Sequence, residues 1–372
     1  MKNRTWLRRS AFLALGAVVL SGCSRPSREE LHTPAPAPVT PAAAPAASGP
    51  APLEPAALQA PFKPASPAGH TATSEDTEAR IALGYKLFFD PRLSKNHDIS
   101  CNSCHNLATF GVDNKALSDG HQGQKGTRNS PTVYNAAGHI AQFWDGRAPT
   151  LEVQAEGPLF NPVEMALPDD KRLIATLASM PEYTRYFQQA FPGEKKPLSP
   201  GNVVRAIAAF ERQLTTPSRF DRFLGGEHGA LTEQERRGLE LFVSTGCTTC
   251  HNGPAVGGTS FQKLGLMHDW PIVEDTGRFG VTRNEEDLQK FRVPTLRNVE
   301  KTGPYLHDGS IQALPEMVRL MAKHQLSKDL TEPEVEDVVA FLRSLTGELP
   351  QRYIQPPELP RSTRKTPKPD PT

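Results

Sequence analysis

The spacing of apolar residues along the chain predicts helices that occur in two matching pairs. An opening helix that contains Gly84-Tyr-Lys-Leu-Phe88 matches a second one that contains Gly238-Leu-Glu-Leu-Phe242. A closing helix over 209–215 likewise matches one over 340–346, and both have apolar residues at helical spacing. Because the order of opening helix, loops and closing helix occurs twice, we expect two mostly helical domains in tandem.

The helices of the second pair have recognisable ends. Thr232 with Glu235, and Thr331 with Glu334, form the Thr-x-x-Glu pattern of a capping box, in which each side chain accepts a hydrogen bond from the other residue's amide. Gly347 follows the last helix where a left-handed glycine commonly ends one. We expect helices that begin after both threonines.

The amino-terminal residues predict export. Four basic residues precede an apolar run over 11–20, which is too short to span a bilayer comfortably, and Leu20-Ser-Gly-Cys23 follows directly. Residues 1–22 resemble a bacterial lipoprotein signal peptide, in which the thiol of Cys23 is acylated. An ordinary secretory signal is the alternative. By resemblance to sorted lipoproteins, Ser24 favours the outer membrane.

Composition divides the remainder of the chain. Residues 23–74 are rich in Pro and Ala, and residues 350–372 are polar and rich in Pro, Lys and Arg. Such segments bury too little apolar surface to offset chain entropy, so we expect a disordered tether and a disordered tail. The helical domains are then predicted at 75–216 and 217–349, a comfortable length for two domains.

Charge and hydropathy exclude some classes of function. The formal net charge of the 372 residues is +1, which gives no indication of nucleic-acid binding. The part between tether and tail contains no apolar run of membrane-spanning length.

Two short motifs bring in the chemistry. Cys101-Asn-Ser-Cys104-His105 and Cys247-Thr-Thr-Cys250-His251 each have two thiols that can add to the vinyl groups of a haem and a histidine that can bind its iron. Four thiolates could instead bind zinc, but such a site needs neither histidine. The two motifs and Cys23 use all five cysteines, so no disulfide is predicted. We therefore predict two covalently attached c-type haems.

The sixth iron ligand decides between electron transfer and chemistry on a small molecule. For the second haem the candidates are three methionines, Met267, Met317 and Met321. A methionine near an apolar helix commonly fills the core, so at least two of the three are expected to do that instead. For the first haem the residues alone leave several candidates open: His121, His139, Met165 and Met180.

The chain also resembles the bacterial di-haem cytochrome c peroxidases. The resemblance runs in order through the whole part between tether and tail, in several motifs of five or more residues. Besides the haem motifs these are Gly126-Thr-Arg-Asn-Ser-Pro-Thr132, Gln142-Phe-Trp-Asp-Gly-Arg147, Val293-Pro-Thr-Leu-Arg-Asn-Val299 and Gly303-Pro-Tyr-Leu-His-Asp-Gly309.

The resemblance implies a role for each haem. The first would be the peroxidatic site, with His121 as its removable sixth ligand, Glu164 as the catalytic carboxylate and Gln154 beside it. Such a carboxylate can accept a proton from peroxide and return it to the departing oxygen, while an amide orients the substrate. The glycines around His121 would let its loop move.

The second haem would receive the electrons. Met321 falls at the position of the axial methionine, with Met317 one turn away as the fallback, and Trp144 matches the tryptophan between the haems. The resemblance also implies a calcium ion between the domains, bound by the side chain of Asn129 and the carbonyls of Thr302 and Pro304, because oxygen donors suit that hard cation.

The same resemblance implies a periplasmic enzyme that reduces hydrogen peroxide with electrons from a small cytochrome c or a cupredoxin, and that forms a homodimer. Two alternatives remain. MauG-type enzymes oxidise a partner protein and are recognised by a tyrosine as the sixth ligand of the second haem, where this chain has Met321. A non-enzymatic di-haem carrier would need neither Glu164 nor a releasable His121.

Overall fold

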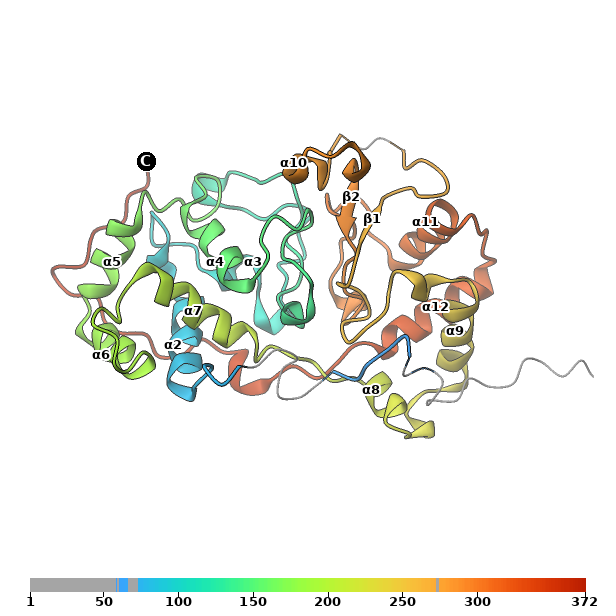
Figure 1. Cartoon of the computed structure of the whole chain (residues 1–372), viewed down its shortest axis with the longest axis horizontal. Coiled ribbons are helices and arrows are strands. Elements are labelled where there is room, and N and C mark those ends of the chain that lie inside the picture. Colours follow the sequence, from blue (N-terminus) through green and yellow to red (C-terminus); the bar gives the residue numbers. More distant parts are fainter. Residues whose placement is uncertain (1–57, 59, 66–72, 272–273) are drawn as a thin grey trace, which may run out of the picture. The chain divides into compact units, whose positions relative to one another are not determined.

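The computed structural model describes residues 58, 60–65, 73–271 and 274–372. The expected signal peptide and Cys23 lie outside the described residues. The described part is mostly helical (Figure 1). The elements of its N-terminal lobe are α2 (Glu78–Phe89), α3 (Cys101–Cys104), α4 (Leu151–Phe160), α5 (Asp170–Ala178), α6 (Pro181–Ala190) and α7 (Pro200–Glu211).

The C-terminal lobe adds a small sheet to its helices. Its elements are α8 (Arg219–Leu224), α9 (Glu233–Ser244), α10 (Phe279–Thr282), α11 (Leu314–Leu326), α12 (Glu332–Ser344) and the antiparallel strands β1 (Phe261–Lys263) and β2 (Lys290–Arg292). The predicted mostly helical fold is thereby confirmed. Among the described residues, no helix combines the length and the apolarity that a membrane crossing requires.

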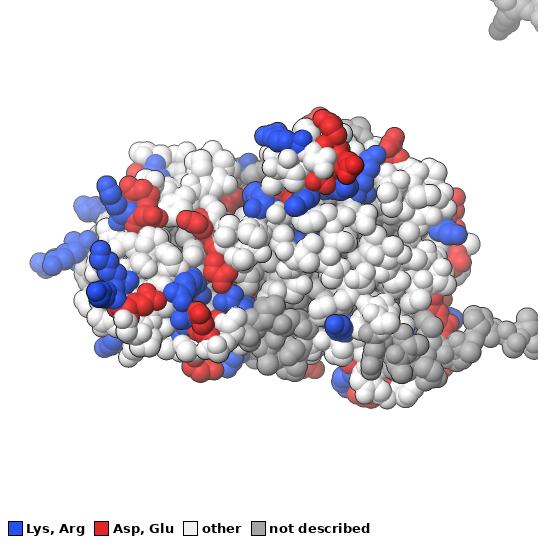
Figure 2. Space-filling model, viewed as in Figure 1, with Lys and Arg blue, Asp and Glu red and all other residues white. Residues whose placement is uncertain are grey.

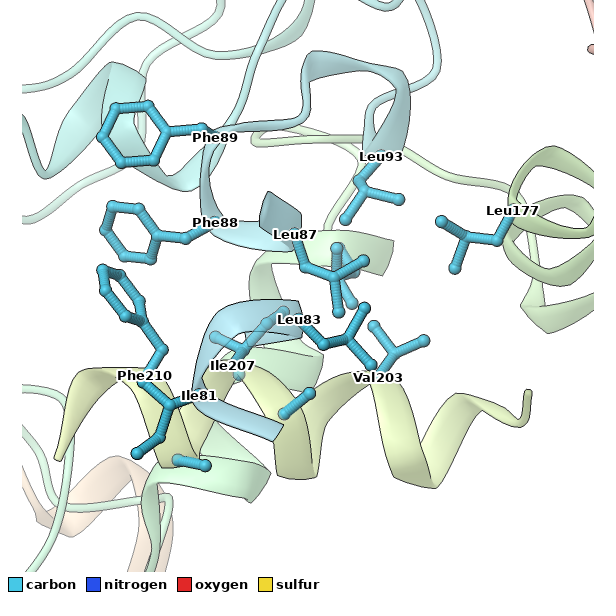
Figure 3. Packing of buried hydrophobic residues seen from close by; sticks show 14 of the residues in the cluster. Ile81, Leu83, Leu87, Phe88, Phe89, Leu93, Leu177, Val203, Ile207 and Phe210 are labelled. Atoms are coloured by element: carbon cyan, nitrogen blue, oxygen red, sulfur yellow. The ribbon is translucent and has the colours of Figure 1, made fainter. Parts of the chain in front are cut away.

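The two matching helix pairs cross at equivalent glycines. A Cβ on Gly84 of α2 would lie 1.8 Å from the carbonyl oxygen of Ala206 in α7, and one on Gly238 of α9 would lie 1.8 Å from that of Asp337 in α12. Each glycine therefore lets the closing helix approach its partner's backbone. Figure 3 shows the apolar side chains of α2 and α7 packed together around the first crossing. The repeat in the sequence thus reflects one crossing built twice.

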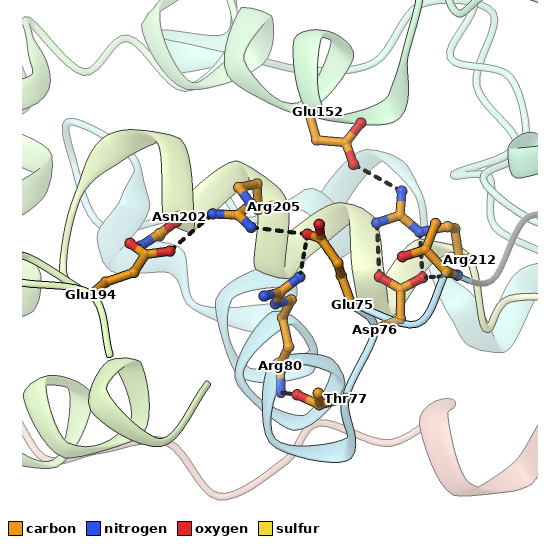
Figure 4. Close-up of polar contacts among 10 residues, drawn as sticks. Glu75, Asp76, Thr77, Arg80, Glu152, Glu194, Asn202, Arg205 and Arg212 are labelled. Atoms are coloured by element: carbon orange, nitrogen blue, oxygen red, sulfur yellow. Dashed lines mark hydrogen bonds and ion pairs between the residues drawn. The ribbon is translucent and has the colours of Figure 1, made fainter. Parts of the chain in front are cut away.

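Arginines of the closing helix also fix the start of the opening helix (Figure 4). Arg212, at the end of α7, binds both carboxylate oxygens of Asp76, at 2.8 and 2.9 Å, and also reaches Glu152 of α4. Arg205 of α7 pairs with Glu75 at 3.0 Å. These contacts tie the first residues of the lobe to its last helix.

Replacing Gly238 with Ala is expected to destabilise the protein by about 1–3 kcal/mol, because the added methyl group has no room and the helices must move apart. Gly201, in the first turn of α7, has no atom within 4 Å of the position that a Cβ would occupy. Gly201→Ala is the matched control and should leave stability unchanged or slightly raised, since alanine favours helix. Chemical denaturation of both variants measures the difference; equal stabilities would contradict the close crossing.

Two expectations about helix ends have different outcomes. Both capping boxes are present, at Thr232 with Glu235 and at Thr331 with Glu334. The left-handed stop at Gly347 is wrong, because Gly347 has no positive φ. A Cβ there would instead lie 2.1 Å from the carbonyl oxygen of Thr216, so this glycine admits the segment that joins the lobes.

Part of the expected tether belongs to the C-terminal lobe. Leu58, Phe62 and Ala65 are buried, and the ring of Phe62 packs edge-on against Phe220 of α8 with centroids 5.1 Å apart. The Ala65 amide donates to Asp221 Oδ1. The expectation of disorder over all of 23–74 is therefore wrong for these residues, because isolated large apolar side chains within a Pro/Ala-rich stretch suffice to anchor it.

The expectation of a disordered tail over 350–372 is also wrong. This segment lies along the N-terminal lobe, where the buried ring of Tyr353 packs against Phe210 and Tyr85 with centroids 5.0 and 5.2 Å apart. Further along, Lys86 donates to the Glu358 carbonyl and Arg92 to the Pro360 carbonyl, both at 2.7 Å. Composition could not reveal these contacts, because basic side chains of the lobe bind the tail's backbone carbonyls.

Charged side chains of both signs are interspersed on the face that Figure 2 shows, and large areas between them are neutral.

Candidate haem and peroxide sites

The N-terminal haem motif begins in a single helical turn. Cys101 and Cys104 form the ends of α3, and the Ser100 amide in front of it donates to Ser103 Oγ at 3.0 Å. His105 follows the turn, its Nδ1 is buried, and burial lowers its pKa. Both thiols are free of disulfides. Two free thiols beside a buried neutral imidazole are the donor set that a covalent haem needs.

The C-terminal motif borders a cavity. Gly246 is left-handed, with φ of 95°, and turns the chain from α9 into the motif. Burial lowers the pKa of His251 to about 4, and its Nδ1 is buried as well. Cys247, Cys250 and His251 line a mostly apolar cavity together with residues of α9, α11 and α12. An apolar cavity with a neutral imidazole at its wall fits a haem.

The structure narrows the choice among the methionines. Met317 and Met321 both line this cavity from α11, one helical turn apart. Met267 is 57% exposed and is not among the cavity residues. Met165 and Met180 are buried in the N-terminal core, where they fill space. Met321 therefore stays the predicted ligand, with Met317 as its neighbour.

Trp144 connects the N-terminal lobe to this cavity. It lines the cavity and packs with Leu264 and Phe291, with Met321 partly buried against the same cluster. Its indole Nε1 donates to the Asn129 carbonyl at 2.9 Å. The ring is therefore fixed between the N-terminal loops and the predicted methionine ligand.

His121 and Glu164 are held together by their backbones. The His121 amide donates to the Glu164 carbonyl at 2.8 Å. A Cβ on Gly120 would lie 1.8 Å from the Val163 carbonyl oxygen, so only glycine permits this approach. The loop that carries the predicted removable ligand thus rests directly on the turn that carries the predicted catalytic acid.

The Glu164 carboxyl is half-buried and oriented. Its Oε1 accepts a hydrogen bond from Asn161 Nδ2 at 2.8 Å. Burial raises its pKa above the usual value, and this effect outweighs the opposing influences of Arg147 and Asn161. A carboxyl whose pKa is raised holds its proton more readily than an exposed one, which suits a group that accepts a proton and returns it.

Gln154 lies on the helix against which the Glu164 turn folds. Gln154 is half-buried in α4, and the turn returns to the end of that helix through the Met165 amide, which donates to the Pro158 carbonyl at 3.1 Å. The described residues show no hydrogen bond between the Gln154 and Glu164 side chains.

Two candidate residues have surroundings that the sequence did not predict. His121 Nε2 lies 3.0 Å from the main-chain oxygen of Thr372, and the side chain of the adjacent Gln122 donates to the Pro371 carbonyl at 2.8 Å. His139, considered for the first haem, lines the cavity of the C-terminal motif instead.

The expected calcium ligands lie at the same boundary between the lobes. Asn129, Thr302 and Pro304 all line the cavity. Asn129 Nδ2 donates to the Lys115 carbonyl at 2.9 Å, which leaves the amide oxygen free to bind a cation. The described residues contain no cluster of three or more His, Cys, Asp or Glu suited to a metal ion, and the predicted set does not require one.

Sequence reasoning missed a buried carboxyl beside the first motif. Glu211 of α7 occupies the position that Leu342 has in the second repeat. Its Oε2 has no hydrogen-bond partner in the described part of the chain, and burial raises its pKa to about 8. Burial and the charge of Glu211 raise the pKa of the Cys101 thiol. Aligning the repeats shows the acid in an apolar position, and this was the available signal.

The pKa of Glu211 is higher in the folded state than in the unfolded state. The free energy of unfolding should therefore fall as the pH rises from about 4.5 to about 8. Glu211→Gln should remove this loss, which amounts to roughly 5 kcal/mol at pH 9. Denaturation at pH 5 and pH 9 measures it, with Glu156→Gln at an exposed position of α4 as control. A loss of equal size in Glu211→Gln would contradict the assignment.

Comparisons with known proteins agree on one family. A family model for di-haem cytochrome c peroxidase matches residues 78–229, and one for cytochrome c matches residues 235–346. Cytochrome c551 peroxidase of Pseudomonas aeruginosa is 47% identical over 299 residues, which cover 79% of this chain and 85% of that protein. The protein of the same name from Nitrosomonas europaea is 45% identical over 304 residues, which cover 81% and 89%.

A solved structure is similar as well. A MauG-like protein associated with microbial copper homeostasis superposes with a TM-score of 0.69 at 31% identity, over 76% of this chain and 93% of that protein.

Proposed function

Because the chain belongs to the di-haem cytochrome c peroxidase family, we propose that peroxide is reduced at its N-terminal haem with electrons that enter at its C-terminal haem. Membership makes the protein an oxidoreductase that acts on peroxide and carries two c-type haems. The order of electron flow and the role of each residue are the content of the proposal.

The contact between the His121 loop and the Glu164 turn is the observation that carries the proposal. The hydrogen bond from the His121 amide to the Glu164 carbonyl makes the two residues one structural unit. A movement of the loop that removes His121 from the haem would therefore also shift the backbone of Glu164. Opening of the site and the position of the catalytic acid are thereby linked.

The chain's own residues would handle the protons. A haem held by Cys101, Cys104 and His105 would supply the binding position for peroxide and pass on the donor's electrons for cleavage of the O–O bond. Glu164, with its raised pKa, accepts a proton from the bound peroxide and returns it to the departing oxygen. Asn161 holds the carboxyl in place, and Gln154 orients the substrate without titrating.

The electron path would cross the boundary at Trp144. This ring contacts the cluster that includes Met321 and is fixed by its hydrogen bond to Asn129. Met321 as the sixth ligand would give the C-terminal haem the higher potential and make it the acceptor for electrons from outside.

Calcium at Asn129, Thr302 and Pro304 would stiffen this boundary. Chelation should therefore lower peroxide turnover, and added calcium should restore it where magnesium does not. Asn129→Asp should keep the site and Asn129→Ala should weaken it. Elemental analysis confirms that chelation has removed the calcium. Full peroxide turnover in the calcium-free protein would exclude a role of calcium in catalysis.

The proposal also covers the protein's surroundings. We infer a periplasmic protein that is lipid-anchored at Cys23, with the outer membrane favoured. Its electron donor would be a small cytochrome c or a cupredoxin, and the protein would form a homodimer. Cys23 lies outside the described residues, so this part is supported by the sequence alone.

A MauG-type protein oxidase is the second candidate, because one similar structure is of a MauG-like protein and Tyr305 also lines the C-terminal cavity. The Tyr305 hydroxyl, however, donates to the Val299 carbonyl at 3.2 Å, while both methionines of α11 are available. The peroxidase is therefore favoured.

Steady-state kinetics tests the proposal. With a reduced small cytochrome c as donor, hydrogen peroxide should oxidise two donor molecules per peroxide. A protein that oxidises no donor, or that consumes peroxide without the donor, contradicts the proposal.

A further inference from the structure

His139 is held against the C-terminal lobe, and both of its ring nitrogens are buried with no hydrogen-bond partner among the described residues. Its position is fixed on either side, because the His139 amide donates to the Ala136 carbonyl and the Ile140 amide to the Gly258 carbonyl at 2.9 Å. A Cβ on Gly258 would lie 2.3 Å from the ring atom Cδ2 of His139, so this glycine makes room for the imidazole. Buried polar groups normally have partners, so the ring is placed for one.

A second polar group without a full set of partners lines the same cavity. Arg292 of β2 is 2% exposed, and burial lowers its pKa to about 10. Its Nε donates to the Phe143 carbonyl at 3.3 Å, and no carboxylate among the described residues pairs with it. A buried cation without a counter-ion is costly, so an anion is expected here.

We propose that His139, beside Arg292, donates a hydrogen bond to a propionate of the C-terminal haem. The cavity that these two residues line is the one bordered by Cys247, Cys250 and His251, so the group that fills it is the haem. The propionates are the anionic groups of a haem, and the two side chains supply the donors that such a group requires. The inference depends on the attachment of the haem and is independent of which haem reacts with peroxide.

The contact has a consequence for the redox potential. A donor that offsets the negative charge of a propionate favours the reduced iron and raises its potential. His139 would thus be a positioning and tuning residue from the N-terminal lobe that acts on the haem of the C-terminal lobe.

Potentiometric titration of both haems tests this assignment in three variants. His139→Phe should lower the potential of the C-terminal haem and leave that of the N-terminal haem unchanged. His139→Gln, which keeps a donor, should restore most of the difference. His228→Phe, at an exposed position of the C-terminal lobe, should change neither potential.

Three results would overturn the inference. The potential of the C-terminal haem could be unchanged in His139→Phe, or both haems could shift equally, which would indicate a general structural effect. Loss of the near-infrared absorption of methionine-ligated iron in His139→Phe would show that the residue acts on axial ligation instead.

A different observation carries a second inference, which concerns the tail. The tail places the main-chain oxygen of Thr372 3.0 Å from His121 Nε2. Asp370 holds this end through its amide, which donates to the Lys95 carbonyl at 3.0 Å, and Gln122 holds Pro371. A nitrogen that carries a proton for a hydrogen bond has no lone pair for a metal, so the two roles of Nε2 exclude each other.

We infer that residues 367–372 stabilise His121 in the position released from the N-terminal haem. This inference rests on the proposed function, in which His121 is the removable ligand. Deleting 367–372 while keeping Tyr353 and the rest of the tail should then increase the low-spin fraction of the N-terminal haem in the half-reduced protein.

Spectra of the half-reduced proteins distinguish the outcomes. The deletion should have no effect on the spin state in a His121→Ala background, where no ligand can return. An unchanged or smaller low-spin fraction in the deletion alone would overturn the inference. If the full-length protein never forms a high-spin haem, the proposed function itself fails, and the role of the tail fails with it.

Discussion

Replacing Glu164 with Gln is expected to lower kcat/KM for hydrogen peroxide by about 10²- to 10⁴-fold while both haems stay attached. The variant keeps the shape and the Asn161 contact but removes the group that carries the proton. Peroxide-dependent oxidation of a reduced donor measures the loss, and the pyridine haemochrome spectrum confirms two haems per chain.

The pH dependence gives a second readout of the same group. Because burial raises the pKa of Glu164 above the ordinary value of 4.5, the carboxylate is lost at a higher pH than usual as the solution is acidified. The acid limb of kcat/KM should therefore lie above pH 4.5 and be absent from the residual activity of Glu164→Gln. Glu156→Gln, on the exposed face of α4, is the control. Turnover unchanged in Glu164→Gln would exclude the role.

Replacing Met321 with Leu should lower the potential of the C-terminal haem by roughly 0.1 V or more, within the range of about 0.8 V that axial ligands span. Electron entry would then fail, and turnover with the donor should fall in parallel. The near-infrared band of methionine ligation should disappear.

Met317→Leu is the matched control, because Met317 lies one turn away on the same helix and borders the same cavity. It should keep the band and the potential. If the two variants exchange these results, Met317 is the ligand, and the choice made from the sequence is wrong.

The sequence predicted the features that are encoded locally. The haem motifs are contiguous, and the repeat was visible because glycine at the crossing and phenylalanine one turn later recur in both halves. Glycine is required at positions 84 and 238 for the same reason, because a Cβ at either position would lie 1.8 Å from the backbone of the crossing helix. Capping boxes were likewise readable, since both partners lie within four residues.

Contacts between distant segments could not be predicted. The tail was expected to be disordered because its composition is polar, yet it is held by contacts such as that of Arg92 with the Pro360 carbonyl, 268 residues apart. The position of His139 followed no local pattern either, because the ring packs against Gly258 of the other lobe. Glu211 differs, because aligning the two repeats places it opposite Leu342 and so gave a signal for its burial in α7.

In the proposed mechanism, His121 leaves an N-terminal haem that then reacts with peroxide through Glu164. Electron paramagnetic resonance and optical spectra of the fully oxidised and half-reduced protein, with calcium present and before and after peroxide, test this mechanism most directly. We expect half-reduction to make one haem high-spin and peroxide then to react with that haem. Two haems that stay low-spin and do not react with peroxide would contradict it.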